Sequence, residues 1–512
     1  MNKKILKWNM IFQYGYVLTN IFNSIVLLPL YLKNIDSATL GIWLATGNIL
    51  AWMTLADPGV GDVLQQKIAE LRGKSRNTEI GKTIGSGFIA SGIILVLSVL
   101  VGFIFYMLIG VIINKDVSQY PNLQIALALS IIATGMSLVS FSMSGINQGM
   151  HNSAQVAIAS LIANGVFLVV NVMLLYFDFG VISIAFANLC RALFINVYNI
   201  SSMQKLLKRE RLKINFDFTH FKKFIRIFSF TSASRIVGGF SASMDMIVLA
   251  RFLPPAMITI FEINKRPIGL SQSLVGRHSV ALMPLISHAK GTGNRNGIID
   301  LINKQFKFYS YATLFISLMF ILSYENLITT WTGTGRYAGD TIMYLLVANF
   351  FFGLIGYFMA NMGYALGDIK RNSLVNIVKG VVLGVLLFFV ARKYGIIGTL
   401  AVMLAVTLAT DFSYFTYRLY KLGYLQSALL KGILNLWSII LPCGLLIGWG
   451  CRRLVDSIFS EHMHLPKLLV SGTLFTISFM LLLLLVDSEL RSTLRLLKDK
   501  FITTSFLILM RT

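Results

Sequence analysis

Ten charged side chains lie inside long apolar stretches of this sequence, where an unpaired charge is costly and usually serves a function. Six are basic and four are acidic, so at least two cations have no acidic partner there. A guanidinium group binds phosphate through two parallel hydrogen bonds, so this excess of basic residues favours an anionic ligand. The basic set is Arg191, Arg235, Lys265, Arg266, Arg277 and Lys379. The acidic set is Asp57, Asp245, Glu262 and Asp411.

Some of these charges have a simpler explanation than ligand binding. Glu262 precedes Lys265 and Arg266 by three and four residues, so a local ion pair on one helix face is an equally good interpretation. Pro267 follows directly and removes a backbone donor, which predicts a kink beside the two cations. Arg277 is expected near the cytoplasmic end of its span, where a long side chain reaches the headgroups.

Three cations are stronger candidates for substrate binding because no acid lies near them on the same helix. Arg191 and Lys379 have none within one turn. Arg235 and Asp245 are ten residues apart, roughly 15 Å along a helix, so they cannot pair within it. We expect these three cations to line a substrate cavity, with the other three basic residues as further candidates.

Carboxylates at membrane depth could carry a coupling ion, H⁺ or Na⁺. The candidates are Asp57, Asp245 and Asp411, although Asp57 could simply cap the cytoplasmic end of its span. No other cofactor is expected, because the sequence has no P-loop and no Gly-x-Ser-x-Gly elbow. Its six histidines and three cysteines lack the spacing of a metal site or a disulfide framework. No catalytic residue and no enzyme are predicted.

The elements that hold these charges are predicted to be membrane-spanning helices. Hydrophobic residues make up 56% of the 512 residues and charged residues only 13%, with a mean hydropathy of +0.73. A soluble protein carries about a quarter charged residues, whereas a spanning helix needs about 20 apolar ones. Fourteen spans are expected, near residues 9–33, 39–57, 83–113, 122–146, 154–177, 181–203, 224–250, 256–286, 308–325, 341–366, 373–391, 395–417, 432–451 and 468–486.

The net charge of +24 follows from membrane topology and calls for no nucleic acid partner. Most of the 45 Lys and Arg residues lie in the terminal segments and in connections on the same side of the membrane as the N-terminus. Because cytoplasmic connections carry the excess of Lys and Arg, both termini are expected in the cytoplasm. The densest basic group, within residues 205–226, follows the sixth span and attracts anionic membrane lipids. No connection is long enough to form a separate catalytic domain.

An internal repeat organises the spans. Three pairs of segments match in order and spacing: 64–73 with 282–291, Gly149 with Gly367, and Phe179-Gly180 with Tyr394-Gly395. Six spans followed by six similar ones predict two parallel lobes around a central cavity. We therefore expect an all-α polytopic protein of about 14 transmembrane helices, with two six-helix lobes and two additional C-terminal helices. The predicted boundaries are 1–210, 211–424 and 425–512.

The stretch Asp57-Pro-Gly-Val-Gly-Asp62 resembles the Asp-x-Gly-x-Gly segment of polysaccharide flippases, which belong to the multidrug/oligosaccharidyl-lipid/polysaccharide exporter superfamily. Asn147-Gln-Gly149 and the Phe/Tyr-Gly-Val/Ile turns are also similar. Span count and loop pattern extend the resemblance over nearly the whole chain. Pro58 stands where the family often has Leu, a departure that concerns the local turn.

The resemblance implies a flippase of the bacterial inner membrane that serves surface polysaccharide biosynthesis, as for O-antigen and lipopolysaccharide. Such a protein moves polyisoprenoid-diphosphate-linked oligosaccharide to the outer leaflet by alternating access. Its implied partners are that substrate, membrane lipids, and the polysaccharide polymerase with its chain-length machinery. The last two helices would line a groove for the lipid tail.

Three other functions are considered. A multidrug or cation antiporter of the same superfamily usually has twelve spans and needs acids in its cavity, which six buried cations disfavour. A membrane polysaccharide polymerase needs a large outer loop, which the sequence lacks. A flippase for peptidoglycan precursors is a close relative that the sequence separates poorly.

Overall fold

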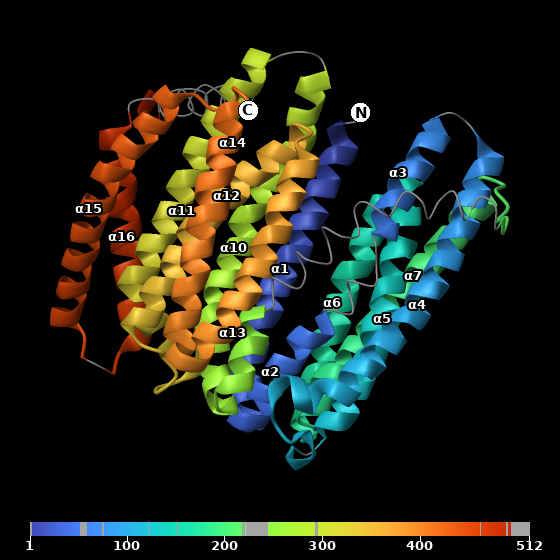
Figure 1. Cartoon of the computed structure of the whole chain (residues 1–512), viewed down its shortest axis with the longest axis horizontal. Coiled ribbons are helices and arrows are strands. Elements are labelled where there is room, and N and C mark those ends of the chain that lie inside the picture. Colours follow the sequence, from blue (N-terminus) through green and yellow to red (C-terminus); the bar gives the residue numbers. More distant parts are fainter. Residues whose placement is uncertain are drawn as a thin grey trace, which may run out of the picture. The chain divides into compact units, whose positions relative to one another are not determined.

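The computed structural model describes residues 3–51, 59–73, 76–120, 122–150, 152–217, 221, 244–291, 295–460, 462–487 and 490–492. Every regular element within them is a helix (Figure 1). Among the described residues, nine helical segments are long and apolar enough to cross a membrane. The predicted class, an all-α polytopic membrane protein, is confirmed.

The chain forms two compact units. The first comprises residues 1–263 and 373–402, and the second comprises residues 264–372 and 403–512. Helices of the first unit are α1 (Lys3–Asn34), α2 (Ser37–Ala51), α3 (Val60–Gly73), α4 (Asn77–Ile113), α5 (Leu123–Gly149), α6 (Ser153–Tyr176) and α7 (Val181–Arg209). Helices of the second are α11 (Arg295–Thr332), α12 (Asp340–Ala365), α14 (Phe415–Lys421), α15 (Ser427–Ile458) and α16 (His464–Val486). Two helices contribute to both units, α10 (Pro255–Gly291) and α13 (Ile369–Thr407). The predicted boundaries at residues 210 and 424 stay a prediction.

The predicted spans coincide with helices wherever the structure describes them. The eleventh and twelfth are merged in α13, which continues through a π-helical segment (Leu408–Tyr414) into α14. Gly395 divides α13 at the predicted boundary, because its backbone (φ 55°, ψ −138°) is not helical.

The two glycines that end the matched repeat segments share one unusual conformation. Gly180, before α7, has φ 53° and ψ −129°, close to the angles of Gly395. Side chains other than hydrogen strongly disfavour this region. In both helices a hydroxyl of the first turn donates to the glycine carbonyl, from Ser183 three residues after Gly180 at 2.6 Å and from Thr399 four residues after Gly395 at 2.9 Å. The backbone therefore repeats at the positions where the sequence repeat was found.

Close backbone contact joins α3 to α5 in the first unit. A methyl group on Gly145 would lie 2.1 Å from the Gly61 carbonyl oxygen, and one on Gly61 would lie 2.5 Å from the Phe141 carbonyl oxygen. One turn further on, a methyl group on Gly149 would lie 2.8 Å from Ile68 Cβ. Small residues four apart let membrane helices approach this closely. Gly61 and Gly149, which belong to the motifs singled out in the sequence, thus have a packing role here.

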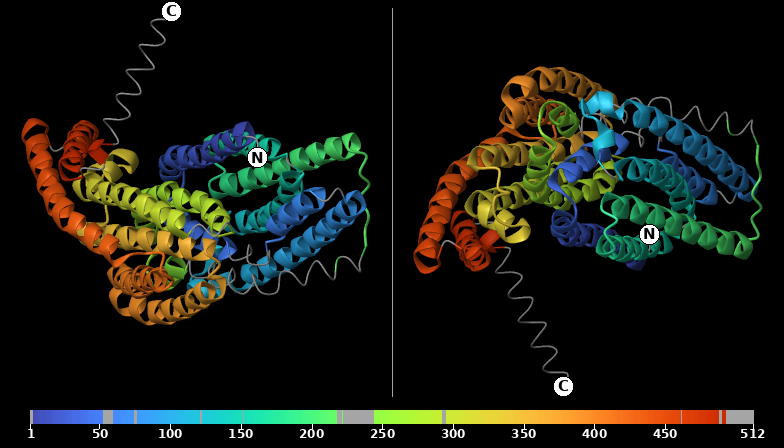
Figure 2. Two further views of the ribbon diagram at one scale, coloured as in Figure 1. Left: turned by 90° about the horizontal axis from the view of Figure 1, so that it is seen from above. Right: turned by 90° about the horizontal axis from the view of Figure 1, so that it is seen from below.

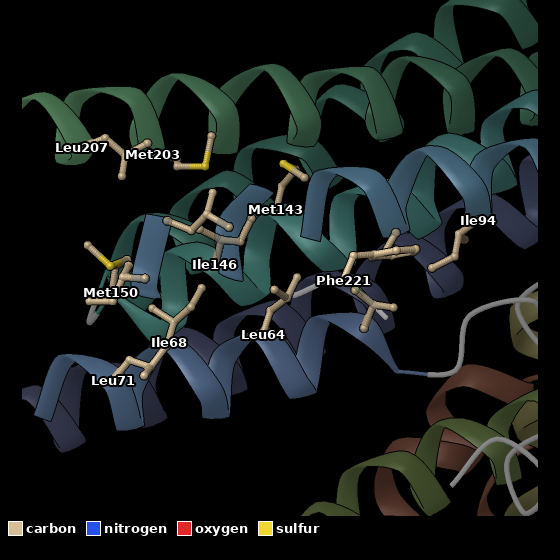
Figure 3. Close-up of a cluster of buried hydrophobic side chains, with 14 of the residues drawn as sticks. Leu64, Ile68, Leu71, Ile94, Met143, Ile146, Met150, Met203, Leu207 and Phe221 are labelled. Atoms are coloured by element: carbon tan, nitrogen blue, oxygen red, sulfur yellow. The ribbon is translucent and has the colours of Figure 1, made fainter. Parts of the chain in front are cut away.

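The apolar core of the first unit forms around this contact (Figure 3). Leu64, Ile68 and Leu71 lie on one face of α3, at the spacing of successive helical turns. They belong to one cluster with side chains of α5 such as Ile146 and of α7 such as Leu207. The helices α5 and α7 pack along each other, and α6 packs against α7 and α1.

In the second unit, the last two helices are fastened to α11. The helices α15 and α16, coloured orange to red in Figures 1 and 2, lie side by side at the edge of this unit. Rings of Phe475 and Phe479 on α16 pack around Phe315 of α11. After α16, the carboxylate of Asp487 is 5% exposed and lies 2.8 Å from the Lys307 ammonium group of α11. The predicted C-terminal pair is therefore an integral part of the second unit.

Candidate functional site: charged and amide side chains of the spanning helices

Arg191, on α7, is held by an aromatic ring. Its guanidinium carbon lies 5.4 Å from the ring centroid of Phe167 on α6, and its side chain is half-buried. A ring face attracts a cation without neutralising its charge. No carboxylate of the described residues lies within ion-pair distance of it. This environment suits the predicted anion-binding role, which stays a prediction.

Asp245 and Lys379 belong to adjoining helical segments of the first unit. Asp245 is 2% exposed and lies in the helical segment 244–252. That segment packs on α13, where a methyl group on Gly384 would lie 2.6 Å from the terminal methyl of Met244. Further along both segments, the rings of Phe252 and Phe388 meet edge to face at 5.5 Å. Lys379 is half-buried, and both charged side chains interact with neighbours.

Lys265 and Arg266 lie beside a polar clamp in the second unit. The neighbouring Asn264 is 1% exposed, and its amide donates to the Arg336 carbonyl at 2.7 Å and accepts from the Ala338 N–H at 3.1 Å. The two cations are thus close to the connection between α11 and α12.

The helix α10 continues through Pro267, which follows the two cations, to Gly291, so the proline does not end it. The kink expected beside these cations stays a prediction. Further along α10, Arg277 is exposed, in line with the expectation that its side chain reaches the headgroups. Its neighbour His278 contacts the Gln305 amide oxygen of α11 at 2.8 Å.

Asp411 occupies the π-helical segment Leu408–Tyr414. A methyl group on Gly356 of α12 would lie 2.5 Å from Asp411 Cβ, so the two backbones are in close contact there. π-Helical segments within α-helices are frequent at functional sites. Asp411 is half-buried and interacts with a neighbour, so its coupling role stays a prediction. Asp57 and Arg235 lie outside the described residues.

Two ion pairs of the second unit were missed by sequence reasoning. The guanidinium group of Arg418 on α14 contacts the Asp368 carboxylate, just before α13, at 2.5 and 3.2 Å. The Lys467 ammonium group, 7% exposed, meets Asp456 at 2.6 Å between α16 and α15. Each pair joins helix ends, and all four residues lie outside the spans predicted from the sequence.

Buried amides form a second polar set that the charge-based search overlooked. On α7, the Asn196 amide donates to the Met136 carbonyl of α5 at 2.8 Å, and Asn199 donates to Ser144 at 3.1 Å. In the second unit, Asn361 of α12 donates to Ser279 of α10 at 2.8 Å. Asparagine inside a predicted span is itself a signal of such interhelical bonds.

No protein-family model and no curated protein matches this chain. Several solved structures share its fold. The structure of lipid II flippase MurJ in an inward closed conformation has a TM-score of 0.67 at 16% identity, over 93% of this chain and 98% of that one. An inward-facing multidrug resistance MATE family transporter of the MOP superfamily has a TM-score of 0.64 at 14% identity, over 78% and 95%. The MATE multidrug transporter DinF-BH, in a ligand complex, has a TM-score of 0.59 at 16% identity, over 82% and 96%. The chain therefore shares the fold of these lipid II flippase and MATE transporter structures, as the resemblance of its sequence implied.

Proposed function

We propose that this protein is a flippase for polyisoprenoid-diphosphate-linked oligosaccharide in surface polysaccharide biosynthesis. The observation that carries the proposal is the length of the structural match. The lipid II flippase structure covers 93% of this chain, whereas the two multidrug transporters cover 78% and 82%. The two multidrug transporters leave 22% and 18% of this chain uncovered. Residues 425–512, which contain α15 and α16, make up about 17% of the chain, a similar share. These two helices would serve the lipid tail of the substrate.

The charges inside the spans support an anionic headgroup as the cargo. Arg191 keeps its charge over an aromatic ring, and Lys379 is half-buried in α13. A diphosphate would supply negative charge to a basic set that outnumbers the acids of the spans by six to four. Arg235, Lys265, Arg266 and Arg277 are the further proposed contacts. The protein shields a polar headgroup that could not cross hydrocarbon unaided.

The proposed location is the bacterial inner membrane, with both termini in the cytoplasm, as the distribution of Lys and Arg indicates. The substrate would be loaded from the cytoplasmic leaflet and passed to the polymerase and chain-length machinery outside. H⁺ or Na⁺ bound at Asp57, Asp245 or Asp411 is the proposed source of coupling. The structure describes two of these three, and Asp245 is more deeply buried than Asp411.

The proposal is tested in a strain that lacks the protein. We expect loss of surface polymer, with lipid-diphosphate-linked repeat units retained in the cytoplasmic leaflet. Complementation with Arg191→Gln and Lys379→Gln should restore less polymer than the unaltered gene. Arg392→Gln is the matched control for Lys379→Gln, because Arg392 is an exposed cation of the same helix. Single repeat units displayed outside but left unpolymerised would instead identify a polymerase.

A multidrug antiporter is the second candidate, because MATE transporters match the fold almost as well as the flippase does. It predicts normal surface polymer and raised sensitivity to cationic drugs in the same strain. It also predicts that neutralising Asp245 or Asp411 lowers drug resistance, while neutralising Arg191 does not. That pattern would refute the flippase proposal.

A further inference from the structure

A groove opens in the first unit between the start of α6 and the second half of α7. Its volume is about 480 Å³, within the roughly 300–1,000 Å³ of small-ligand sites. Its α7 wall follows one helix face through Phe194, Tyr198, Ser201, Lys205 and Arg209. None of its lining residues is acidic. The sequence-based prediction of a cationic cavity did not include this groove.

Apolar, polar and cationic groups follow one another along the groove. Phe194 and the 65% exposed Val197 lie at its apolar end. Next to them, the Tyr198 hydroxyl donates to the Gln155 amide oxygen at 2.7 Å. Lys205 lies roughly 16 Å beyond Phe194 along the helix. The same order of groups occurs in a membrane lipid: an apolar tail, a polar ester region and an anionic headgroup.

The cationic end has positive charge available for a ligand. Lys205 and Arg209 are both exposed. Glu210, the next residue along the chain, is bound at 2.7 Å to Arg72 of α3 and forms a longer ion pair of 3.9 Å with Arg209. The groove also includes Asn152, which precedes α6 without a side-chain cap. The first N–H groups of α6 therefore add positive potential at this end.

We propose that this groove binds the headgroup of one anionic phospholipid, with its phosphate between Lys205 and Arg209 and its acyl chains along Phe194 and Val197. In the orientation predicted from the loop charges, the lipid comes from the cytoplasmic leaflet. None of the spanning cations proposed to contact the transported substrate lines this groove. The site therefore differs from the one proposed for the transported substrate, and it does not depend on the flippase proposal.

The test is native mass spectrometry of the full chain, purified and stripped of lipid in a neutral detergent. Phosphatidylglycerol and phosphatidylcholine with identical acyl chains are titrated separately. We expect one tightly bound phosphatidylglycerol. The double variant Lys205→Gln, Arg209→Gln should weaken phosphatidylglycerol binding at least about tenfold, because it removes the attraction of two basic groups to an anionic lipid. Phosphatidylcholine binding should not change.

The matched control is Lys208→Gln with Lys213→Gln, which removes the same charge from exposed positions outside the groove. This variant should keep the phosphatidylglycerol. A second variant, Ser201→Trp, fills the groove without changing its charge and should lose the lipid.

Two results would overturn the proposal. Retention of phosphatidylglycerol by Ser201→Trp, with loss in the Lys205 and Arg209 variant, would mean diffuse surface attraction without a groove site. Tighter binding of undecaprenyl diphosphate than of phosphatidylglycerol, lost in both groove variants, would assign the groove to the transported lipid. Unchanged phosphatidylcholine binding and a single gel-filtration peak show that each variant is folded.

Discussion

Replacing Asp487 by Asn should detach the last two helices from α11 and destabilise the second unit. The Asp487 carboxylate accepts from the Lys307 ammonium group at 2.9 Å, from the Tyr311 hydroxyl at 2.7 Å and from the Leu490 N–H at 3.3 Å. Asn keeps the shape but removes the carboxylate charge that faces the Lys307 ammonium group. Removing one member of a buried pair costs about 3–5 kcal/mol. Because the Lys307 side chain is 22% exposed and partly hydrated, we expect the lower end, about 3 kcal/mol.

The measurement is equilibrium unfolding in mixed micelles of a mild detergent and dodecyl sulfate. Asp487→Asn, Lys307→Met and the double variant complete a double-mutant cycle, which isolates the pairwise term. We expect a coupling free energy of about 2 kcal/mol or more, within the range of close contacts. The α15–α16 pair should also become the first segment cut by a protease. A coupling below about 0.5 kcal/mol, the value of an exposed pair, would refute this reasoning.

The same contact gives a pH dependence of known sign. Burial acts to raise the pKa of Asp487, but the hydrogen bonds from Lys307, Tyr311 and Leu490 and the Lys307 charge outweigh it, so its pKa is lowered. A carboxylate with a lowered folded-state pKa stabilises the fold above its unfolded pKa and loses that contribution as pH falls through the folded value. The stability gap between wild type and Asp487→Asn should be constant from pH 7 to 5. It should narrow below about pH 4, near the unfolded pKa of Asp.

Three other predictions concern a turn, a helix cap and the proposed substrate site. Gly395→Ala should lower the free energy of unfolding by about 1–3 kcal/mol, because Ala would be strained in that backbone conformation. Gly432→Ala, on an exposed and open face of α15, should instead raise it by about 0.5–1 kcal/mol. Both changes are measured in the same micelle assay. Asp36 accepts two N–H groups at the start of α2, so Asp36→Ala should cost about 0.5–2 kcal/mol at pH 7. Although burial acts to raise the pKa of Asp36, these hydrogen bonds lower it, and the cost should therefore disappear as pH falls below about 4, as thermal denaturation at several pH values would show. Arg191→Lys should restore more surface polymer than Arg191→Gln in the deletion strain, and equal restoration would exclude a role for the charge.

The helices were predictable from sequence because spanning a bilayer requires long apolar runs, which hydropathy detects directly. The break between the eleventh and twelfth spans was also predictable, since Gly395 marks a turn that other residues disfavour. The π-helical segment around Asp411 was not predictable, because nothing in its residue types distinguishes it from an ordinary helical turn. The repeat was found from a few shared residues, and the similar backbone angles at Gly180 and Gly395 explain why both positions are glycine.

The site could be predicted only in part, because charge identifies candidates but not their partners. Arg191 was chosen because its own helix has no acid near it, yet its aromatic partner Phe167 is on another helix. The ion pair of Lys307 and Asp487 joins residues far apart in sequence, and no local pattern connects them. The groove on α7 depends on side-chain geometry across two helices.

The contact between Gly61 and Gly145 has a consequence for motion. Helices separated by side chains can slide past one another when rotamers change, as in a shear movement. Between α3 and α5 there is no such deformable layer, because carbonyl oxygens meet glycine backbone directly. A sliding step along this seam would drive backbone atoms into each other. Any conformational change that reaches these two helices must therefore carry α3 and α5 together, as one stiff lever.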